Sequence, residues 1–395
     1  AGNALEEYSF DGFNLAHYGD VIFVSINHRL NILGHLNLAD YGEEFSNSVN
    51  VGIADLVAAL KWIHENIAAF GGDPENVTLC GHSGGGGKVQ CMYQLEEAAP
   101  YFQRGIVLSG ALKGSLEMSD HDSRQIAKSI LEELGITRET IEKIYEVPYE
   151  ELVAAYRKAA PKLREAGVNC NWSPVPNDYF PGFPGTVGFA PGSADKPIIY
   201  GSTLGEFANV PLDTDEKMAM TEEEKLRFLR ERFGSRADHL IDLFRKAYPT
   251  HDILDLAYMD SMVRIPTAAT ALEHAKNNKD NTYVFLAAYC APENGWIPLW
   301  HGGEVCYIFM NEDKVFVLNE PVYGQKLANI FSTLVLNFTK YGDPNNKYLP
   351  KWEPMSAVHH HTMIIDRECI CKEGHDEELV TLFDQTSPKI SFNFI

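Results

Sequence analysis

Cysteine is scarce in this chain of 395 residues, and its few positions are Cys80, Cys91, Cys170, Cys290, Cys306, Cys369 and Cys371. An odd number of cysteines cannot pair completely, and several of these lie within apolar runs. Such usage favours reduced thiols over a disulfide framework. We therefore expect a cytoplasmic protein, with secretion left open because the printed sequence starts at Ala1 and not at Met.

Positive charge is also in short supply. The chain has 33 Lys and Arg against 55 Asp and Glu, which gives a formal net charge of −22. Such a charge repels nucleic-acid phosphates and anionic lipid surfaces, so we expect no nucleic-acid partner and no membrane partner. No apolar run in the sequence is long enough to cross a bilayer.

Sequence patterns for phosphate or metal binding are missing as well. The stretch from Gly81 to Lys88 resembles a phosphate-binding loop, but His82 and Val89 stand where that motif needs glycine and Ser or Thr. The three adjacent histidines at 359–361 cannot all face one ion on a strand, because successive side chains alternate. The spacing of Cys369 and Cys371 fits neither a zinc knuckle nor a C-x-x-C redox pair. We expect no metal and no cofactor.

Strand-like and helix-like segments alternate along the chain. Apolar runs of strand length occupy 21–27, 77–80, 105–110, 196–201, 281–287 and 362–366, and helical periodicity occupies 51–70, 85–95, 120–163, 221–248, 252–277 and 324–341. This alternation predicts an α/β fold whose mostly parallel sheet is covered by helices. We expect one domain over 1–395, with helical or irregular insertions at 115–195 and 207–280.

A glycine-flanked serine follows the second of these apolar runs. Gly81, Ser83 and Gly85 form the pattern G-x-S-x-G, which is typical of a sharp strand-to-helix turn that exposes a serine nucleophile. Glycines suit this turn because neighbours without Cβ atoms let strand and helix approach closely. The pattern alone is weak, because glycine-rich loops around a serine are common.

A serine hydroxyl needs a base, usually histidine, and an acid that orients the base. Glu206 follows the strand-like run that ends at Tyr200, and His301 follows the run that ends near Ala287. Taken singly, Glu206 could be a surface or capping carboxylate and His301 a loop histidine packed beside Trp300. Their order after Ser83 is the one that serine hydrolases with a parallel sheet use, and this joint order favours a catalytic interpretation.

Several segments together resemble the type-B carboxylesterases, the α/β-hydrolase family that includes the cholinesterases. The segments that carry the resemblance are 27–30, 66–79, 81–85, 109–110, 201–206, 301–304 and 337–345. The block from Phe70 to Gly85 is highly specific to that family. Two positions depart from its usual pattern, with His82 in place of Glu and Gly84 in place of Ala.

The resemblance implies a serine hydrolase that cleaves small-molecule carboxylic esters through an acyl-enzyme. It makes Ser83 the nucleophile, Glu206 the acid and His301 the base, with the Gly84 N–H in the oxyanion hole. Family members also carry a glycine-rich oxyanion loop ahead of the segment that resembles 1–16. We expect an N-terminal segment or a second chain to supply that loop, and little activity without it.

Two other functions stay open at this point. The family also contains non-catalytic adhesion proteins, which typically lose the nucleophile or its partners, whereas Ser83, Glu206 and His301 all stand here. An amidase or peptidase could use the same three residues.

Overall fold

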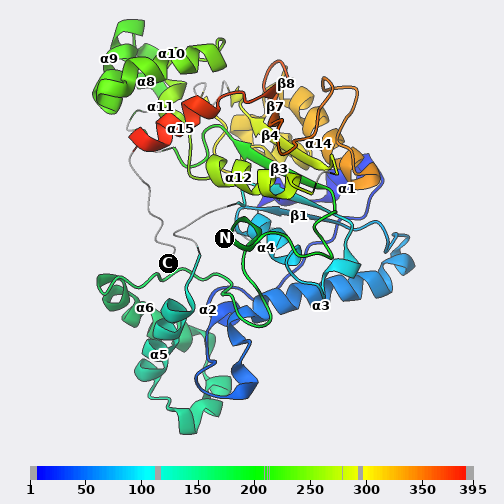
Figure 1. Ribbon diagram of the computed structural model, residues 1–395, viewed down its shortest axis with the longest axis vertical. Helices are drawn as coiled ribbons and strands as arrows, with labels where there is room; N and C mark the ends of the chain where they lie inside the picture. Colours follow the sequence, from blue (N-terminus) through cyan, green and yellow to red (C-terminus); the bar gives the residue numbers. More distant parts are fainter. Residues whose placement is uncertain are drawn as a thin grey trace.

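The computed structural model describes residues 7–111, 117–208, 210, 212, 214–277, 279–291 and 297–387. A six-stranded sheet in the order β1-β2-β3-β4-β7-β8 forms its centre (Figure 1). Pairing is parallel from β1 to β7, and β8 joins antiparallel to β7. The strands are β1 (Thr78–His82), β2 (Arg104–Leu108), β3 (Ile198–Thr203), β4 (Thr282–Ala287), β7 (His361–Ile365) and β8 (Ile370–Glu373). Five of the six predicted strands are confirmed, and their parallel course brings their carboxyl ends to one edge of the sheet.

The predicted strand at 21–27 is wrong. Its residues belong to no strand, and Ile22, Phe23 and Val24 are exposed. An apolar run becomes a buried strand only when a neighbouring strand pairs with its backbone. Within the described part of the chain, β1 pairs with β2 alone, so no ladder joins this segment to the sheet.

Both faces of the sheet are covered. Alternate residues of β2 separate, with Ile106 and Leu108 in one apolar core and Val107 in the other, as the two-residue period of a strand requires. The first core is closed by α13 (Val305–Ile308) and α14 (Gly324–Tyr341). The second is closed by α3 (Val51–Asn66), α4 (Gly84–Met92) and α12 (Arg264–Ala275).

The helix predicted at 51–70 divides into α3 and a short turn of 3-10 helix, η4 (Ile67–Phe70), which ends at Gly71 with φ 85°. Asn50 directly precedes α3, but its side chain makes no capping hydrogen bond. It bonds instead to both backbone groups of Val175, which ties α3 to the aromatic-rich segment of the first predicted insertion.

Two helical groups extend from the sheet toward opposite ends of the molecule (Figure 1). One contains α5 (Asp120–Leu134), η6 (Arg138–Glu146) and α6 (Tyr149–Glu165). The other contains α8 (Thr214–Ala219), α9 (Glu222–Phe233), η7 (Gly234–Arg236) and α10 (Ala237–Ala247). Positions 115–116, 209, 211, 213 and 278 of the two predicted insertions lie outside the described residues, and the insertion boundaries stay predictions.

The remaining elements are short, apart from the helix near the C-terminus. The helices are α1 (Phe13–Gly19), α2 (Asn31–His35), α7 (Pro184–Val187), α11 (Asp255–Tyr258) and α15 (Glu377–Thr386). A two-stranded ribbon pairs β5 (Cys290–Ala291) with β6 (Ile297–Pro298). The other 3-10 turns are η1 (Tyr8–Phe10), η2 (Glu43–Phe45), η3 (Ser48–Asn50), η5 (Ala99–Tyr101), η9 (Glu312–Lys314) and η10 (Phe316–Leu318). Among the helices described here, none combines the length and the apolar character needed to span a membrane.

Candidate active site

Ser83 occupies the sharp turn between β1 and α4. Its backbone has φ 56° and ψ −123°, a strained conformation for a residue with a side chain. The turn is fixed from both sides, because the Ser83 N–H donates to the Leu108 carbonyl oxygen at 2.8 Å and its own carbonyl accepts from Gly87 N–H at 3.0 Å. A Cβ on Gly81 would lie 2.2 Å from the Gly85 carbonyl oxygen, so only glycine fits there. The sequence therefore builds the predicted serine turn.

Glu206 lies just beyond the end of β3 and is almost fully buried. Its Oε1 atom accepts hydrogen bonds from Ser109 Oγ at 2.6 Å and from the Thr203 N–H at 2.8 Å. Its Oε2 atom lies 2.5 Å from His301 Nδ1. Both carboxylate oxygens are thus held, and the carboxylate is directed at the imidazole.

His301 is fixed through its backbone as well as its ring. Its N–H donates to the Glu206 carbonyl oxygen at 2.9 Å, and its ring packs between His82 and Phe207, with centroids 4.4 and 4.0 Å away. Because Glu206 accepts the Nδ1 proton, the neutral imidazole presents an unprotonated Nε2. That Nε2 atom is buried and makes no hydrogen bond.

Ser83 and His301 lie at the same edge of the sheet. No hydrogen bond joins these two residues in the part of the chain that the structure describes. Their segments meet where the His301 ring packs against His82, the residue before Ser83, with ring centroids 4.4 Å apart. In unliganded enzymes the serine–histidine contact is often long and tightens when substrate binds. The arrangement therefore places a buried acid–base pair beside the strained serine.

Burial shapes the electrostatics around this pair. Burial, followed by the negative charge of Glu206, raises the pKa of Glu304 to about 8 and that of Asp260 to about 6. Burial and then the charge of His301 lower the pKa of His82 to about 3, so His82 is neutral at pH 7. The Glu206–His301 pair therefore lies in a region of little solvent, where electrostatic interactions are strong.

Gly84, the predicted oxyanion donor, is the first residue of α4. The first N–H groups of a helix have no partner inside the helix, and the helix dipole makes them favourable sites for negative charge. Gly84 itself is exposed. Residues 1–6 lie outside the described residues. The completion of this site by a segment ahead of residue 1, or by a second chain, stays a prediction.

The sequence model of the carboxylesterase family matches residues 2–381. The chain belongs to the carboxylesterase family. It is a carboxylic ester hydrolase with the α/β-hydrolase fold.

Several known proteins resemble this carboxylesterase over most of its length. Para-nitrobenzyl esterase of Bacillus subtilis is 26% identical over 95% of the chain and 75% of that protein. Human carboxylesterase 3 is 26% identical over 87% of the chain and 63% of that protein. A solved esterase from Clostridium hathewayi, described as able to hydrolyze aliphatic aromatic polyesters, is 36% identical with a TM-score of 0.92. That match covers 98% of this chain and 77% of the solved one.

Sequence reasoning missed one contact in this carboxylesterase. Ser109 lies near the end of the predicted strand 105–110 and was assigned no role from the sequence, yet its hydroxyl donates a hydrogen bond to Glu206 Oε1. Its backbone φ is 48°, so the chain turns sharply after β2 and directs Ser109 toward the next strand end. The sequence signal was the Ser109–Gly110 pair at the end of a buried strand. Gly110 approaches Gly86 of the serine turn too closely for a Cβ on either residue, which places this strand end beside the site.

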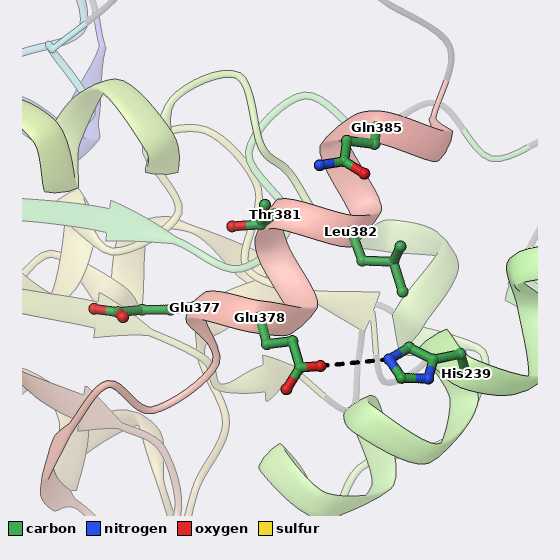
Figure 2. Close-up of a pocket in the computed structure, with 6 residues that line it drawn as sticks. All are labelled: His239, Glu377, Glu378, Thr381, Leu382 and Gln385. Carbon is green, nitrogen blue, oxygen red and sulfur yellow. Dashed lines mark ion pairs between the residues drawn. The ribbon is translucent and has the colours of Figure 1, made fainter.

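A separate hollow lies between α10 and α15 (Figure 2). It has a volume of about 350 Å³, and Figure 2 shows His239 and Glu378 facing each other across it at 3.5 Å. Both side chains are mostly exposed, so this ion pair is weak. Its lining contains none of the residues discussed above.

Proposed function

We propose that the ester hydrolysis of this family proceeds here through an acyl-enzyme on Ser83, with His301 as the base and Glu206 as the acid that orients it. The observation that carries this proposal is the state of His301. Its Nδ1 is held by a buried carboxylate, and its Nε2 is left without a hydrogen bond beside the strained serine turn.

Each step assigns a proton to a named atom. His301 Nε2 accepts the Ser83 hydroxyl proton while Oγ attacks the ester carbonyl, and Glu206 stabilises the imidazolium. The Gly84 N–H donates to the oxyanion. The imidazolium then protonates the leaving alcohol, and a water molecule activated by His301 releases the acid from the acyl-enzyme.

The surroundings of His301 support this order of events. Glu206 already has Ser109 and Thr203 as hydrogen-bond donors, so its carboxylate need not reorganise when the imidazole becomes charged. His82, the ring against His301, has a pKa lowered to about 3 and therefore adds no competing positive charge. We propose small-molecule esters as substrates.

A covalent label tests the assignment. A serine-directed organophosphate should add one adduct per chain, on the peptide that contains Ser83, and should stop hydrolysis of p-nitrophenyl acetate. Ser83→Ala should take up no label and lose turnover, while its circular dichroism spectrum stays that of the parent. Ser193→Ala is the matched control, because Ser193 is a fully buried serine whose hydroxyl has no partner. Undiminished hydrolysis by Ser83→Ala would contradict the proposal.

A further inference from the structure

A second cluster of reactive side chains lies outside the candidate active site. His251 Nδ1, Asp255 Oδ2 and Cys290 Sγ converge from three segments, the loop after α10, the start of α11 and the start of β5. The nitrogen lies 3.2 Å from the oxygen and 3.6 Å from the sulfur, and the oxygen and sulfur are 3.4 Å apart. The His251 and Asp255 side chains are 5% and 2% exposed, so the convergence is an internal feature.

These separations match one face of a tetrahedral zinc site. Bond lengths of about 2.3 Å to sulfur, 2.0–2.1 Å to nitrogen and 2.0–2.2 Å to oxygen give ligand separations of roughly 3.4 Å for N···O, 3.6 Å for S···O and 3.6 Å for N···S. Each observed separation lies within about 0.2 Å of that geometry.

Two further side chains hold the first three in place. Asp366 Oδ2 lies 2.9 Å from His251 Nε2, so this carboxylate can accept the Nε2 proton when a metal ion occupies Nδ1. Lys217 Nζ donates to Asp255 Oδ1 at 2.7 Å, so the other carboxylate oxygen faces the cluster. An outer carboxylate on a histidine is the usual support of a zinc ligand.

The cluster also has room for a fourth ligand. A cavity of about 360 Å³ opens beside it, and its lining includes all three converging side chains together with Thr250, Lys225 and Arg367. A zinc ion with three protein ligands keeps one position for water or another small ligand. Sulfur and imidazole ligands favour zinc over magnesium or calcium, which prefer oxygen alone.

We propose that His251, Asp255 and Cys290 bind one Zn²⁺ ion, with water from the adjoining cavity as the fourth ligand. Without the metal, the Cys290 thiol donates its proton to Asp255 in a hydrogen bond. When zinc binds, Cys290 becomes a thiolate and that proton leaves to solvent. The ion would join α11 to the β5–β6 ribbon, and β6 leads directly into the segment that carries His301. It would thus brace the candidate active site from outside. The sequence predicted no metal, because these ligands are scattered and form no motif.

Metal content and cobalt absorption test the site in the whole chain. The purified protein should hold about one zinc ion per chain after dialysis, measured by plasma mass spectrometry. Replacing zinc with Co²⁺ should produce a thiolate-to-cobalt charge-transfer band and the visible absorption of tetrahedral cobalt. Cys290→Ser should lose the charge-transfer band. The control is Cys371→Ser, which replaces a thiol in β8 and should keep the band.

Thermal unfolding supplies an independent measurement. Chelation of the metal should lower the Tm of the parent and of Cys371→Ser, and added Zn²⁺ should restore it. The proposal is overturned if the parent, shown to be folded by its circular dichroism spectrum and cooperative unfolding, holds no zinc, gives no cobalt band and has the same Tm with and without Zn²⁺. The cluster would then be a metal-free ion-pair network. Failure of the serine mechanism would leave these metal readouts unchanged.

Discussion

Two histidines near the carboxyl edge of the sheet are held by carboxylates, and they are held differently. The Nδ1 atom of His301 contacts one carboxylate, Glu206, and its Nε2 atom makes no hydrogen bond. The Nε2 atom of His251 contacts Asp366, and its Nδ1 atom faces Asp255 and Cys290. Glu206 follows the end of β3 and Asp366 follows the end of β7, so the same sheet edge supplies both supports. One free nitrogen suits proton transfer, whereas a nitrogen aimed at a carboxylate and a thiol suits a metal ion.

The first prediction removes the free nitrogen. His301→Ala should lower kcat for p-nitrophenyl acetate by about 10⁴–10⁶-fold, because the serine loses its only base and the oxyanion donors remain. Steady-state kinetics at pH 7 would measure this loss. His359→Ala, which removes an exposed histidine, is the control and should keep the parent kcat. A fall of less than tenfold in His301→Ala would show that another group takes the Ser83 proton.

The second prediction removes the outer support of the other histidine. Asp366→Ala should weaken zinc binding by about 10–100-fold, because His251 loses the acceptor that fixes its ring. Competition with a chelator of known affinity would measure the change, and kcat at saturating zinc should stay within about twofold of the parent. Glu368→Ala deletes an exposed carboxylate two residues away and should change neither quantity. Equal zinc affinity in Asp366→Ala and the parent would show that Asp366 does not support zinc binding by His251.

Much of the sheet and of the serine site is predictable from local sequence. Ser83 lies in a glycine pattern that is typical of a strand-to-helix turn, and Glu206 and His301 follow strand ends in the expected order. Each of these signals is contained in a few neighbouring residues. They located the Glu206–His301 pair before any distance was known.

Other features depend on tertiary contacts that local sequence does not encode. The run at 21–27 has the composition of a strand but no neighbour in the described sheet, so pairing decided its state. His251, Asp255 and Cys290 are brought together by the packing of α11 against the β5–β6 ribbon, across almost forty residues of chain. Ser109 meets Glu206 only because β2 and β3 are adjacent.

The third prediction concerns Ser109, a positioning residue that acts through Glu206. Ser109→Ala should lower kcat by about tenfold and leave KM unchanged, because a hydrogen bond to a charged group contributes about 1.5–3 kcal/mol. Ser109→Thr should restore most of the loss by returning the hydroxyl. A purely structural role would instead lower the Tm without separating kcat from KM, and unfolding followed by circular dichroism would reveal that. Ser193→Ala again serves as the control, because its hydroxyl has no partner.

The fourth prediction uses Glu304, which is fully buried beside the Glu206–His301 pair and has no hydrogen-bond partner for either carboxylate oxygen. Its pKa rises from 4.5 to about 8, through burial and then the charge of Glu206. Between these values the folded chain keeps a proton that the unfolded chain has released. The free energy of unfolding should therefore fall as pH rises through this window and level off above it.

Glu304→Gln removes this titration. The free-energy cost of burying the amide does not depend on pH, so it does not change the slope of Tm against pH. The fall in Tm between pH 5 and pH 9 should be smaller in Glu304→Gln than in the parent by about 5 °C, measured by calorimetry in buffers of matched ionic strength. Glu368→Gln neutralises an exposed carboxylate and should keep the parent slope. Parallel curves for Glu304→Gln and the parent would mean that Glu304 is already ionised in the folded chain. Glu304 would then be a second buried negative charge near His301, beside Glu206. The carboxylate beside His251, Asp255, differs from both because it accepts a hydrogen bond from Lys217.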